Sequence, residues 1–489
     1  MKRLVALAGL ALATTASAQS HGDPTAEEAL MRHVAALSDD AMAGRKPGTP
    51  GGDKAVQYIA TQMQAAGLVP GVDGWYQRVD LVERKPKSGR AIWRVDRKRI
   101  VLADRDLILL GAQPRLRLDR APLIFAGHGL QANVEGVDLR GAIVLLLPAP
   151  PGNAPNLPTI EARRAMLASH GAAAVSVIAA PDARWARIRD QYRQGRTLLA
   201  ADVGPAAIGI MNHALWRGLA AEAGLDARQL ETAAAETGFR ALPLGGSVDL
   251  RVGTAIRRYQ SVNVVGRIDG AQRSGEALLY MAHWDHLGIC RRPTVQDRIC
   301  NGAVDNASGV AVMLEAARAL AAGPKPGRSM LFVATTAEEL GLLGARSFAR
   351  NPPIPATSIV AALNLDTVAL APRGAPVAII GRGATPLDPL IDATVRALGR
   401  AVDSDTDANA LISRQDGWEL TKVGIPAVMI GSAFSDMARL ESFFASRYHN
   451  PSDDIHHGIE LGGAAEDMAL HIALGRILAD PARFPTPMR

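Results

Sequence analysis

The sequence predicts an α/β fold in which helices sandwich a mixed, largely parallel sheet, with a β-rich domain inserted into it. From residue 251 onward, apolar runs of strand length alternate with stretches whose apolar residues have helical spacing. Between about residues 85 and 250 the sequence pattern differs, because short β-like runs are interrupted by glycine and proline. The length of 489 residues also exceeds what one ordinary core holds, which favours more than one domain.

The C-terminal part of the chain supplies the predicted sheet. Its strands are expected in the segments SVNVVGRI, EALLYMAH, SMLFVATT, SIVAALNLD, APVAIIG and IPAVMIG. Helices are expected in SGVAVMLEAARALAA and LLGARSFAR. Alternation of this kind is typical of a sheet that helices cover on both faces.

Residues 24–68 are predicted to be helical, with one interruption. The segment AVQYIATQMQAAG has apolar residues at helical spacing and ends at Gly67, a residue type that favours helix termination. The preceding stretch AGRKPGTPGG is rich in glycine and proline and predicts a loop.

The N-terminus has the three-part pattern of a secretory signal peptide over residues 1–18. The stretch MKRLVALAGLALATTASAQS has a basic start, an apolar segment and small residues before an expected cleavage site at Gln19. The apolar segment is too short for a stable bilayer anchor. We therefore expect an exported protein, periplasmic or secreted, without stable membrane insertion. The alternative is a buried N-terminal helix.

The charge of the chain gives little support to nucleic-acid binding. The formal net charge is +6, and removal of the predicted signal peptide with Lys2 and Arg3 lowers it to +4. Nucleic-acid-binding proteins usually concentrate their basic residues on one face. This mild excess is spread over the whole chain, so we expect no nucleic-acid partner.

The chain has two cysteines, Cys290 and Cys300, and they lie close together in the sequence. In an oxidising compartment they could close a short loop as a disulfide. The alternative is a pair of free thiols. Because the chain has only two cysteines, it cannot form a zinc site with four cysteine ligands.

Acids and histidines gather where predicted strands end. The pair His283 and Asp285 follows ALLYMA, the pair Glu338 and Glu339 follows MLFVATT, and Asp366 follows VAALNL. Sites in such sheets gather at the carboxyl ends of strands. The HxD spacing alone could belong to a polar turn, but the convergence of several strand ends favours a site. Two further candidates are Asp305, just before a helix, and His449, in a late loop.

These residue types suit zinc, which accepts imidazole nitrogen and carboxylate oxygen. Two histidines and several carboxylates are enough for two Zn²⁺ ions, and paired metals of this kind serve hydrolysis. In the adjacent pair, one of Glu338 and Glu339 could bind metal while the other acts as general base. The alternative for this pair is a solvated helix start.

Five separated motifs carry a family resemblance. The set HWD, DNASG, AEELGLLGA, NLD and YHNPSD resembles the di-zinc exopeptidases that include aminopeptidase Y, secreted bacterial aminopeptidases and glutamate carboxypeptidase. The match covers about 240 residues of the C-terminal part. The resemblance implies a zinc peptidase domain formed by residues 19–84 and 251–489. The segment 85–250, with VDLRGAIVLLL and HGAAAVSVI, more loosely resembles the protease-associated domain inserted in many members.

The resemblance also implies a role for each motif residue. His283 and Asp366 would bind one zinc, Glu339 and His449 the other, and Asp305 would bridge both. Glu338 would be the general base and would also shuttle the proton. The carboxylate of Asp285 would orient His283, and the hydroxyl of Tyr448 would bind the oxyanion. Tyr448 could also serve plain packing.

Residues near the motifs are assigned lesser roles. Asp453 is expected to orient His449, and Asp416 is expected to be structural rather than catalytic. The histidines that lie outside the motif positions are not expected to bind metal: His286, His456 and His457. The Cys290–Cys300 segment departs from the family pattern and could shape the site entrance.

The expected function is an exported metallopeptidase with two Zn²⁺ ions and peptide substrates, most simply an aminopeptidase. A carboxypeptidase or a glutaminyl cyclotransferase on the same fold is the first alternative, although the long segment 85–250 disfavours the compact cyclotransferases. A binding ectodomain without catalytic activity is the second alternative, and the complete ligand set argues against it. The sequence leaves the oligomeric state open.

Overall fold

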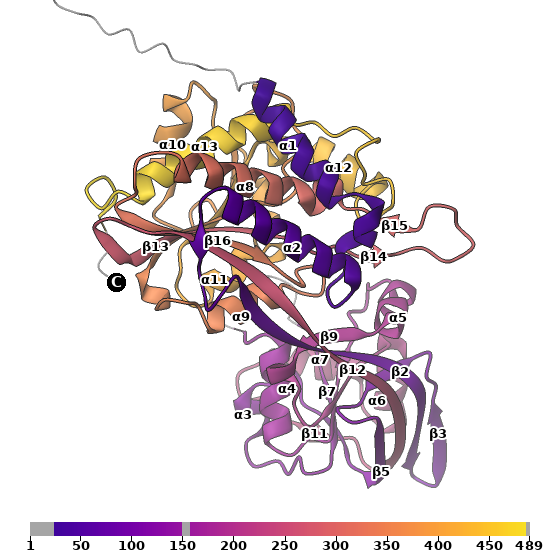
Figure 1. Ribbon diagram of the computed structural model, residues 1–489. Helices are drawn as coiled ribbons and strands as arrows, with labels where there is room; N and C mark the ends of the chain where they lie inside the picture. The colour runs from indigo at the N-terminus through magenta and orange to yellow at the C-terminus, as the bar shows by residue number, and fades with distance from the viewer. Residues whose placement is uncertain (1–23, 149–156, 486–489) are drawn as a thin grey trace, which may run out of the picture. The chain divides into compact units, whose positions relative to one another are not determined.

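The computed structural model describes residues 24–148 and 157–485, which fall into two compact units (Figure 1). The discontinuous unit joins residues 24–79 to residues 261–485, and the central unit comprises Asp80–Gln260. The predicted signal peptide lies outside the described residues. Each unit has hydrophobic clusters of its own and is described separately.

The sheet of the discontinuous unit is mixed, and its central strands are parallel. In spatial order these are β16 (Arg328–Thr335), β13 (Arg273–His283), β17 (Ile359–Asn364) and β19 (Ala427–Gly431). Antiparallel strands flank them: β12 (Ser247–Ile268) pairs with β16, and β18 (Ala378–Ile380) pairs with β19. The predicted largely parallel, mixed sheet is therefore confirmed; most strand ends differ by a few residues, but β12 begins at Ser247, well before the predicted SVNVVGRI segment.

Alternating side chains of β13 divide the core into two layers. Tyr280 faces one cluster, together with residues of helices α1, α2, α8 and α13, whereas Leu279 faces another with residues of α9 and α11. All central strands are buried along their apolar stretch, as expected for a sheet covered on both faces. The bounds of the helices are α1 Pro24–Leu37, α2 Pro50–Ala65, α8 Ser308–Ala321, α9 Leu343–Arg350, α10 Asp388–Ala397, α11 Gly417–Thr421, α12 Met437–Ser446 and α13 Gly462–Leu478 (Figure 1).

The segment AGRKPGTPGG is only partly the loop that the sequence predicts. Helix α2 already begins at Pro50, whereas Ala43 and Gly44, near the end of the 3-10 segment Asp40–Arg45, have non-helical, left-handed φ values of 46° and 66°. Thr49 caps α2 by accepting a hydrogen bond from the N–H of Gly52, and a proline fits the first helical turn because its missing N–H has no partner there. The helix ends before Gly67, whose φ of 85° is the left-handed conformation that glycine tolerates.

The central unit holds a second, six-stranded sheet. Its strands run in the spatial order β11 (Leu242–Pro243), β6 (Leu123–Phe125), β7 (Ile143–Leu146), β8 (Ala174–Ile178), β10 (Ala207–Met211) and β4 (Leu107–Leu110). Antiparallel strands accompany it: β3 (Lys98–Leu102), β5 (Arg115–Ala121), β9 (Arg196–Leu199) and parts of β2 (Tyr76–Val95) and β12. The helices are α3 Gln131–Val134, α4 Ile160–Ser169, α5 Trp185–Gln194, α6 His213–Glu222 and α7 Ala227–Ala233. That this unit is a protease-associated domain stays a prediction.

None of the helices in the described ranges is both long and apolar enough to cross a bilayer.

Candidate metal centre

The predicted site residues of the sheet lie at the carboxyl ends of three neighbouring parallel strands. His283 is the last residue of β13, Glu338 and Glu339 follow β16, and Asp366 follows β17. The chain leaves β13 toward β16 on one side and returns to β17 on the other. Such a reversal of strand order opens a crevice at the carboxyl ends, where ligands bind in open α/β sheets.

Asp305 reaches this crevice from the segment before α8. Its peptide bond to Asn306 is cis. The carboxylate of Asp453 accepts hydrogen bonds from the N–H groups of Val304 at 2.9 Å and Asp305 at 3.0 Å. The expectation that Asp453 orients His449 is therefore wrong. Its carboxylate holds the backbone that carries Asp305 instead.

A first cluster forms around His283, whose side chain is buried. Its Nε2 lies 3.2 Å from Oδ1 of Asp305 and 3.4 Å from Oδ1 of Asp366. Ligands of one tetrahedral zinc at about 2.0–2.1 Å lie about 3.3 Å from each other. These three atoms therefore have the spacing of ligands of one ion. Glu338 is more distant, with 3.9 Å from Oε2 to the same nitrogen.

A second cluster shares Asp305 with the first. Nε2 of His449 lies 2.9 Å from Oε2 of Glu339 and 3.5 Å from Oδ2 of Asp305. Asp305 thus directs one carboxylate oxygen to each cluster, as a ligand that bridges two metal ions requires. The structure brings together all five residues that the resemblance assigns to metal binding.

The hydrogen-bond partners of the second cluster test whether its residues fit a metal ion. Oε1 of Glu339 and Nε2 of His449 are buried, and their close neighbours are other ligand-type atoms of the centre: Nδ1 of His286 lies 2.5 Å from the first, and Oε2 of Glu339 lies 2.9 Å from the second. Imidazole nitrogen and carboxylate oxygen are both donor types that zinc accepts. A metal ion at this position would satisfy both atoms, so the donor set fits zinc.

His286 is a residue of the centre that sequence reasoning excluded. Its Nδ1 lies 2.5 Å from Oε1 of Glu339 and 3.9 Å from Oδ2 of Asp305. His286, Asp305 and Glu339 form one of the two groups whose ligand atoms lie close enough to hold an ion; His283, Asp305 and Asp366 form the other. The signal in the sequence is the second histidine of HWDH, three residues after His283.

Asp285 acts differently from the expectation. The Nδ1 of His283 contacts the main-chain carbonyl oxygen of Asp285 at 3.1 Å, so the carbonyl and not the carboxylate orients the imidazole. The buried carboxylate accepts a hydrogen bond from the backbone N–H of Glu338 at 3.0 Å. Asp285 therefore holds the turn that carries the two glutamates.

The electrostatics of the site separate Glu338 from the carboxylates of the clusters. Burial, reinforced by the charges of Glu339, Asp416 and Asp366, raises the pKa of Glu338 well above its usual value. Burial raises the pKa of Asp285 to about 7. Burial also acts to raise the pKa of Asp305, but the imidazoles of His283 and His449 outweigh it and hold that pKa well below its usual value. A carboxyl group with a raised pKa is suited to accept and return a proton.

Arg45 is a second residue that sequence reasoning missed. Its buried guanidinium donates hydrogen bonds to four main-chain carbonyl groups on three segments. One carbonyl belongs to Trp284, between His283 and Asp285, and the others to Leu37, Asn301 and Gly302. Burial lowers the pKa of Arg45 to about 10, against the opposing charges of nearby carboxylates. Arg45 thereby joins the strand end and the loop before Asp305.

Tyr448 stacks on His449, with ring centroids 3.7 Å apart and an angle of 22° between the planes. It also contacts Phe444 edge-on at 4.9 Å between centroids. These contacts give Tyr448 a packing role. Its role toward an oxyanion stays a prediction.

The remaining candidates lie outside the clusters. Asp416 is buried and accepts a hydrogen bond from the hydroxyl of Thr335, at the end of β16. His456 and His457 are exposed, and His457 pairs with Asp454 at 2.7 Å. Neither histidine belongs to either group that could hold an ion.

Cys290 and Cys300 form the expected disulfide, with 5.8 Å between their Cα atoms. The bond lies beside the short antiparallel pair of β14 (Gly288–Ile289) and β15 (Ile299–Cys300). This pair begins two residues after His286. The disulfide thus fixes the loop between two ligand-bearing segments.

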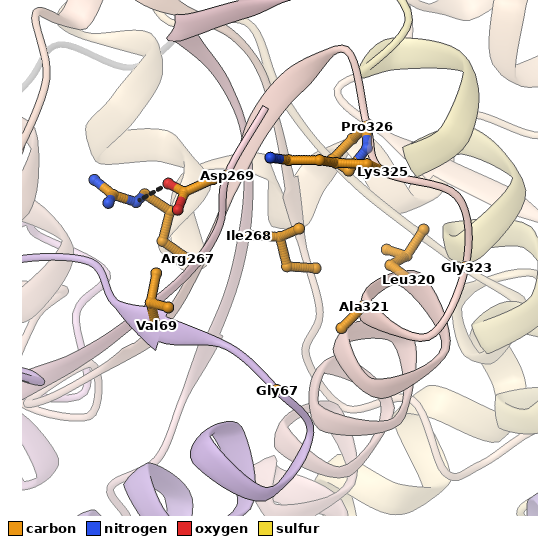
Figure 2. A pocket seen from close by; sticks show the side chains of 10 residues that line it. All are labelled: Gly67, Val69, Arg267, Ile268, Asp269, Leu320, Ala321, Gly323, Lys325 and Pro326. Atoms are coloured by element: carbon orange, nitrogen blue, oxygen red, sulfur yellow. Dashed lines mark ion pairs between the residues drawn. The ribbon is translucent and has the colours of Figure 1, made fainter. Parts of the chain in front are cut away.

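A pocket of about 240 Å³ lies elsewhere in the discontinuous unit (Figure 2). It is lined by Val69, Leu320 and Lys325 among others, and an ion pair of 2.8 Å joins Arg267 to Asp269 at its side (Figure 2). Ile268 in its wall pairs with Met330 near the start of β16, so the pocket lies at the amino ends of the parallel strands. The metal centre lies at their carboxyl ends, and none of its residues lines this pocket.

Comparisons with known proteins agree with this geometry. Residues 263–473 match peptidase family M28. A stretch of 105 residues is 37% identical to a probable zinc metalloprotease of Pyrenophora teres f. teres and covers 22% of each chain. A stretch of 111 residues is 34% identical to the aminopeptidase NAALADL1 of Rattus norvegicus and covers 22% of this chain and 13% of the relative. The matched stretches thus span under a quarter of these relatives.

The fold is also similar to a solved structure over nearly the whole length. The aminopeptidase from Aneurinibacillus sp. strain AM-1 aligns with a TM-score of 0.57 and 20% identity, over 95% of this chain and 96% of that one. This likeness shows the fold. The family match and the zinc-type donor set fall in the same part of the chain: residues 263–473 are similar to peptidase family M28, and the residues that could hold zinc lie within them.

Proposed function

We propose that this chain is an exported aminopeptidase that holds two zinc ions and removes residues from the N-terminus of peptides. The observation that carries the two-ion proposal is the position of Asp305, whose two carboxylate oxygens face two separate clusters. One ion would be held by His283, Asp305 and Asp366. The other would be held by Asp305 together with Glu339 and His449.

When bound, such ions polarise a scissile carbonyl and lower the pKa of water. Glu338 lies beside the first cluster without belonging to it, and its raised pKa suits proton transfer. Its carboxylate accepts the proton of the attacking water and returns it to the leaving amine. The hydroxyl of Tyr448 supports the developing oxyanion, a contact that costs no reorganisation when the group is held in place.

Aminopeptidase activity is favoured over the alternatives because similar proteins are aminopeptidases, among them NAALADL1 of Rattus norvegicus and the Aneurinibacillus enzyme. The complete donor set disfavours a binding ectodomain without catalytic activity. The central unit of Asp80–Gln260 disfavours the compact glutaminyl cyclotransferases. Carboxypeptidase activity is distinguished from aminopeptidase activity by measuring which end of a peptide loses residues.

Export to the periplasm or the medium is supported by the N-terminal pattern of residues 1–18 and by the disulfide, since disulfides persist in oxidising compartments. Fractionation of cells that express the whole chain tests this proposal. Processed protein should appear outside the cytoplasm with Gln19 as its first residue. Unprocessed protein retained in the cytoplasm would contradict export.

Metal content and substrate preference test the main proposal together. Purified protein should contain close to two zinc ions, and a chelator should abolish hydrolysis until zinc is restored. Amino-acid p-nitroanilides and peptides with a free N-terminus should be cleaved, whereas peptides with a blocked N-terminus should not. Release of C-terminal residues from blocked peptides would instead indicate a carboxypeptidase. Activity that persists without metal would refute the zinc mechanism.

A further inference from the structure

We infer that His286 is a ligand of the second zinc ion, so that this ion is held by four protein residues: His286, Asp305, Glu339 and His449. The inference rests on the two-zinc function proposed above. It adds a third imidazole to a centre for which the sequence motifs supply two.

The His286 ring is fully buried. Its Nδ1 lies 2.5 Å from Oε1 of Glu339, and its Nε2 has no hydrogen-bond partner among the described residues. An unpaired buried polar group costs free energy. The ring occupies its position because Gly302 lacks a side chain: a Cβ there would lie 2.6 Å from Cγ of His286. The structure therefore places a buried imidazole directly beside a carboxylate of the second cluster.

The possible donor atoms converge on one point. Nδ1 of His286, Oε1 of Glu339 and Nε2 of His449 are all buried. His286 and His449 approach the same carboxylate, at 2.5 Å from Oε1 and 2.9 Å from Oε2 of Glu339. Both also approach Oδ2 of Asp305, at 3.9 Å and 3.5 Å.

These separations bracket the distance of about 3.3 Å between ligands of one tetrahedral zinc ion. The two imidazole rings also meet edge to face, with centroids 5.7 Å apart and planes at 67°. Two imidazoles and two carboxylates are all donor types that zinc accepts. The four residues thus provide a complete tetrahedral set.

The assignment makes the two ions unequal. Four protein ligands are typical of closed zinc sites, whereas catalytic sites have three protein ligands and keep one position open. The cluster of His283, Asp305 and Asp366 has three ligands and is then the open one. It is also the cluster beside Glu338, at 3.9 Å from His283.

Cadmium-113 coupling to histidine nitrogen tests the assignment directly. Whole protein labelled with ¹⁵N-histidine is loaded with ¹¹³Cd²⁺, and one-bond ¹¹³Cd–¹⁵N couplings are recorded by NMR. Three histidines should show coupling, and His286→Ala should remove one of the three coupled signals. His456→Ala is the matched control, because His456 is exposed and outside both clusters, and it should leave all three.

Zinc titration of the metal-free protein gives an independent measurement. His286→Ala should weaken one of the two zinc sites by about a hundredfold or more, since loss of a partner outside the ligand set already costs 10–100-fold. The other site should keep its affinity, and His456→Ala should change neither. Equal affinities in His286→Ala and the parent protein would overturn the inference.

The NMR outcomes separate this inference from the proposed function. Coupling at two histidines only, with His286 uncoupled, refutes the assignment and leaves the two-zinc proposal standing. Absence of coupling at every histidine refutes both. Because the number of couplings is measured on the unmodified sequence, the test does not depend on whether His286→Ala folds.

Discussion

The buried carboxylate of Asp285 accepts a hydrogen bond from the main-chain N–H of Glu338, with 3.0 Å between Oδ1 and N. Asp285 lies two residues after the end of β13 at His283, and it thereby holds the turn that follows the neighbouring strand β16. Two adjacent strands are locked together at their carboxyl ends, where the proposed general base and one metal ligand lie side by side.

Replacement of Asp285 tests this link. Asp285→Ala removes the acceptor for Glu338 N–H, which holds the turn of Glu338 and Glu339, and should lower kcat by about 10–100-fold, the usual cost of losing a group that supports the residues of a metal centre. Asp285→Asn keeps an oxygen that can accept the bond and should retain more activity than Asp285→Ala. Steady-state kinetics with zinc quantified in parallel provide the measurement. Equal losses in the two variants would contradict an acceptor role.

The neighbours Glu338 and Glu339 should differ in their effect on chemistry and on metal binding. Glu338→Gln keeps the size of the side chain but cannot accept the proton, so kcat should fall by about a hundredfold or more. KM and zinc content should change little, because the lost interaction acts in the transition state. Glu339→Gln should instead lower zinc affinity. Equal loss of metal in both variants would show that the roles are assigned wrongly.

Arg45 should matter for stability because four buried carbonyl groups depend on it. Arg45→Met leaves these acceptors unpaired and should lower the free energy of unfolding by about 3 kcal/mol or more. Arg45→Lys should rescue little, since an ammonium group lacks the planar fork of donors. The exposed Arg396→Met serves as control, with an expected change within about 0.5 kcal/mol. Thermal unfolding of the three variants provides the comparison.

The disulfide should contribute modestly to stability. The two cysteines are ten positions apart in the sequence. For a loop of this length the chain-entropy model gives a stabilisation of a little under about 3 kcal/mol. Paired replacement of Cys290 and Cys300 by alanine should lower the melting temperature. Intact-mass measurement of exported protein should show no thiol that can be alkylated. Two thiols in native exported material would refute the bond.

Glu315 on α8 should give acid-dependent stability. A hydrogen bond from His33 on α1 is the largest cause that lowers the pKa of Glu315, and a hydrogen bond from Arg318 adds to it. Burial acts to raise this pKa, but the net value is lowered to about 2. An acid with a lowered folded-state pKa stabilises the fold above its ordinary pKa of about 4.5. That stability is lost as the pH falls through the folded value, so it disappears between about pH 4.5 and pH 2.

Removal of the carboxylate measures this contribution. The stability advantage of the parent over Glu315→Gln should narrow by up to about 3 kcal/mol across that interval. Chemical unfolding of metal-free protein at several pH values keeps metal release out of the comparison. The exposed Glu441→Gln on α12 is the control and should show no such narrowing. A difference between parent and Glu315→Gln that stays constant with pH would contradict the linkage.

The sequence by itself determined the class of fold and the positions of the site. Apolar runs mark β13, β16 and β17 because buried parallel strands need continuous apolar side chains. Polar residues that interrupt these runs at His283, Glu338 and Asp366 mark the strand ends, and parallel strands bring their ends to one edge. The motif order therefore predicted which side chains meet, and the structure brings those side chains together.

The tertiary structure decided the contacts that support these residues. Asp285 orients His283 through its main-chain carbonyl, and every residue type has that group, so no sequence pattern can indicate it. Asp453 holds the backbone before Asp305 although 148 residues separate them. Arg45 and His286 belong to the centre only because distant segments and Gly302 close around them. Periodicity reports which face of an element is buried, whereas the partner of a buried polar atom depends on which segments pack there.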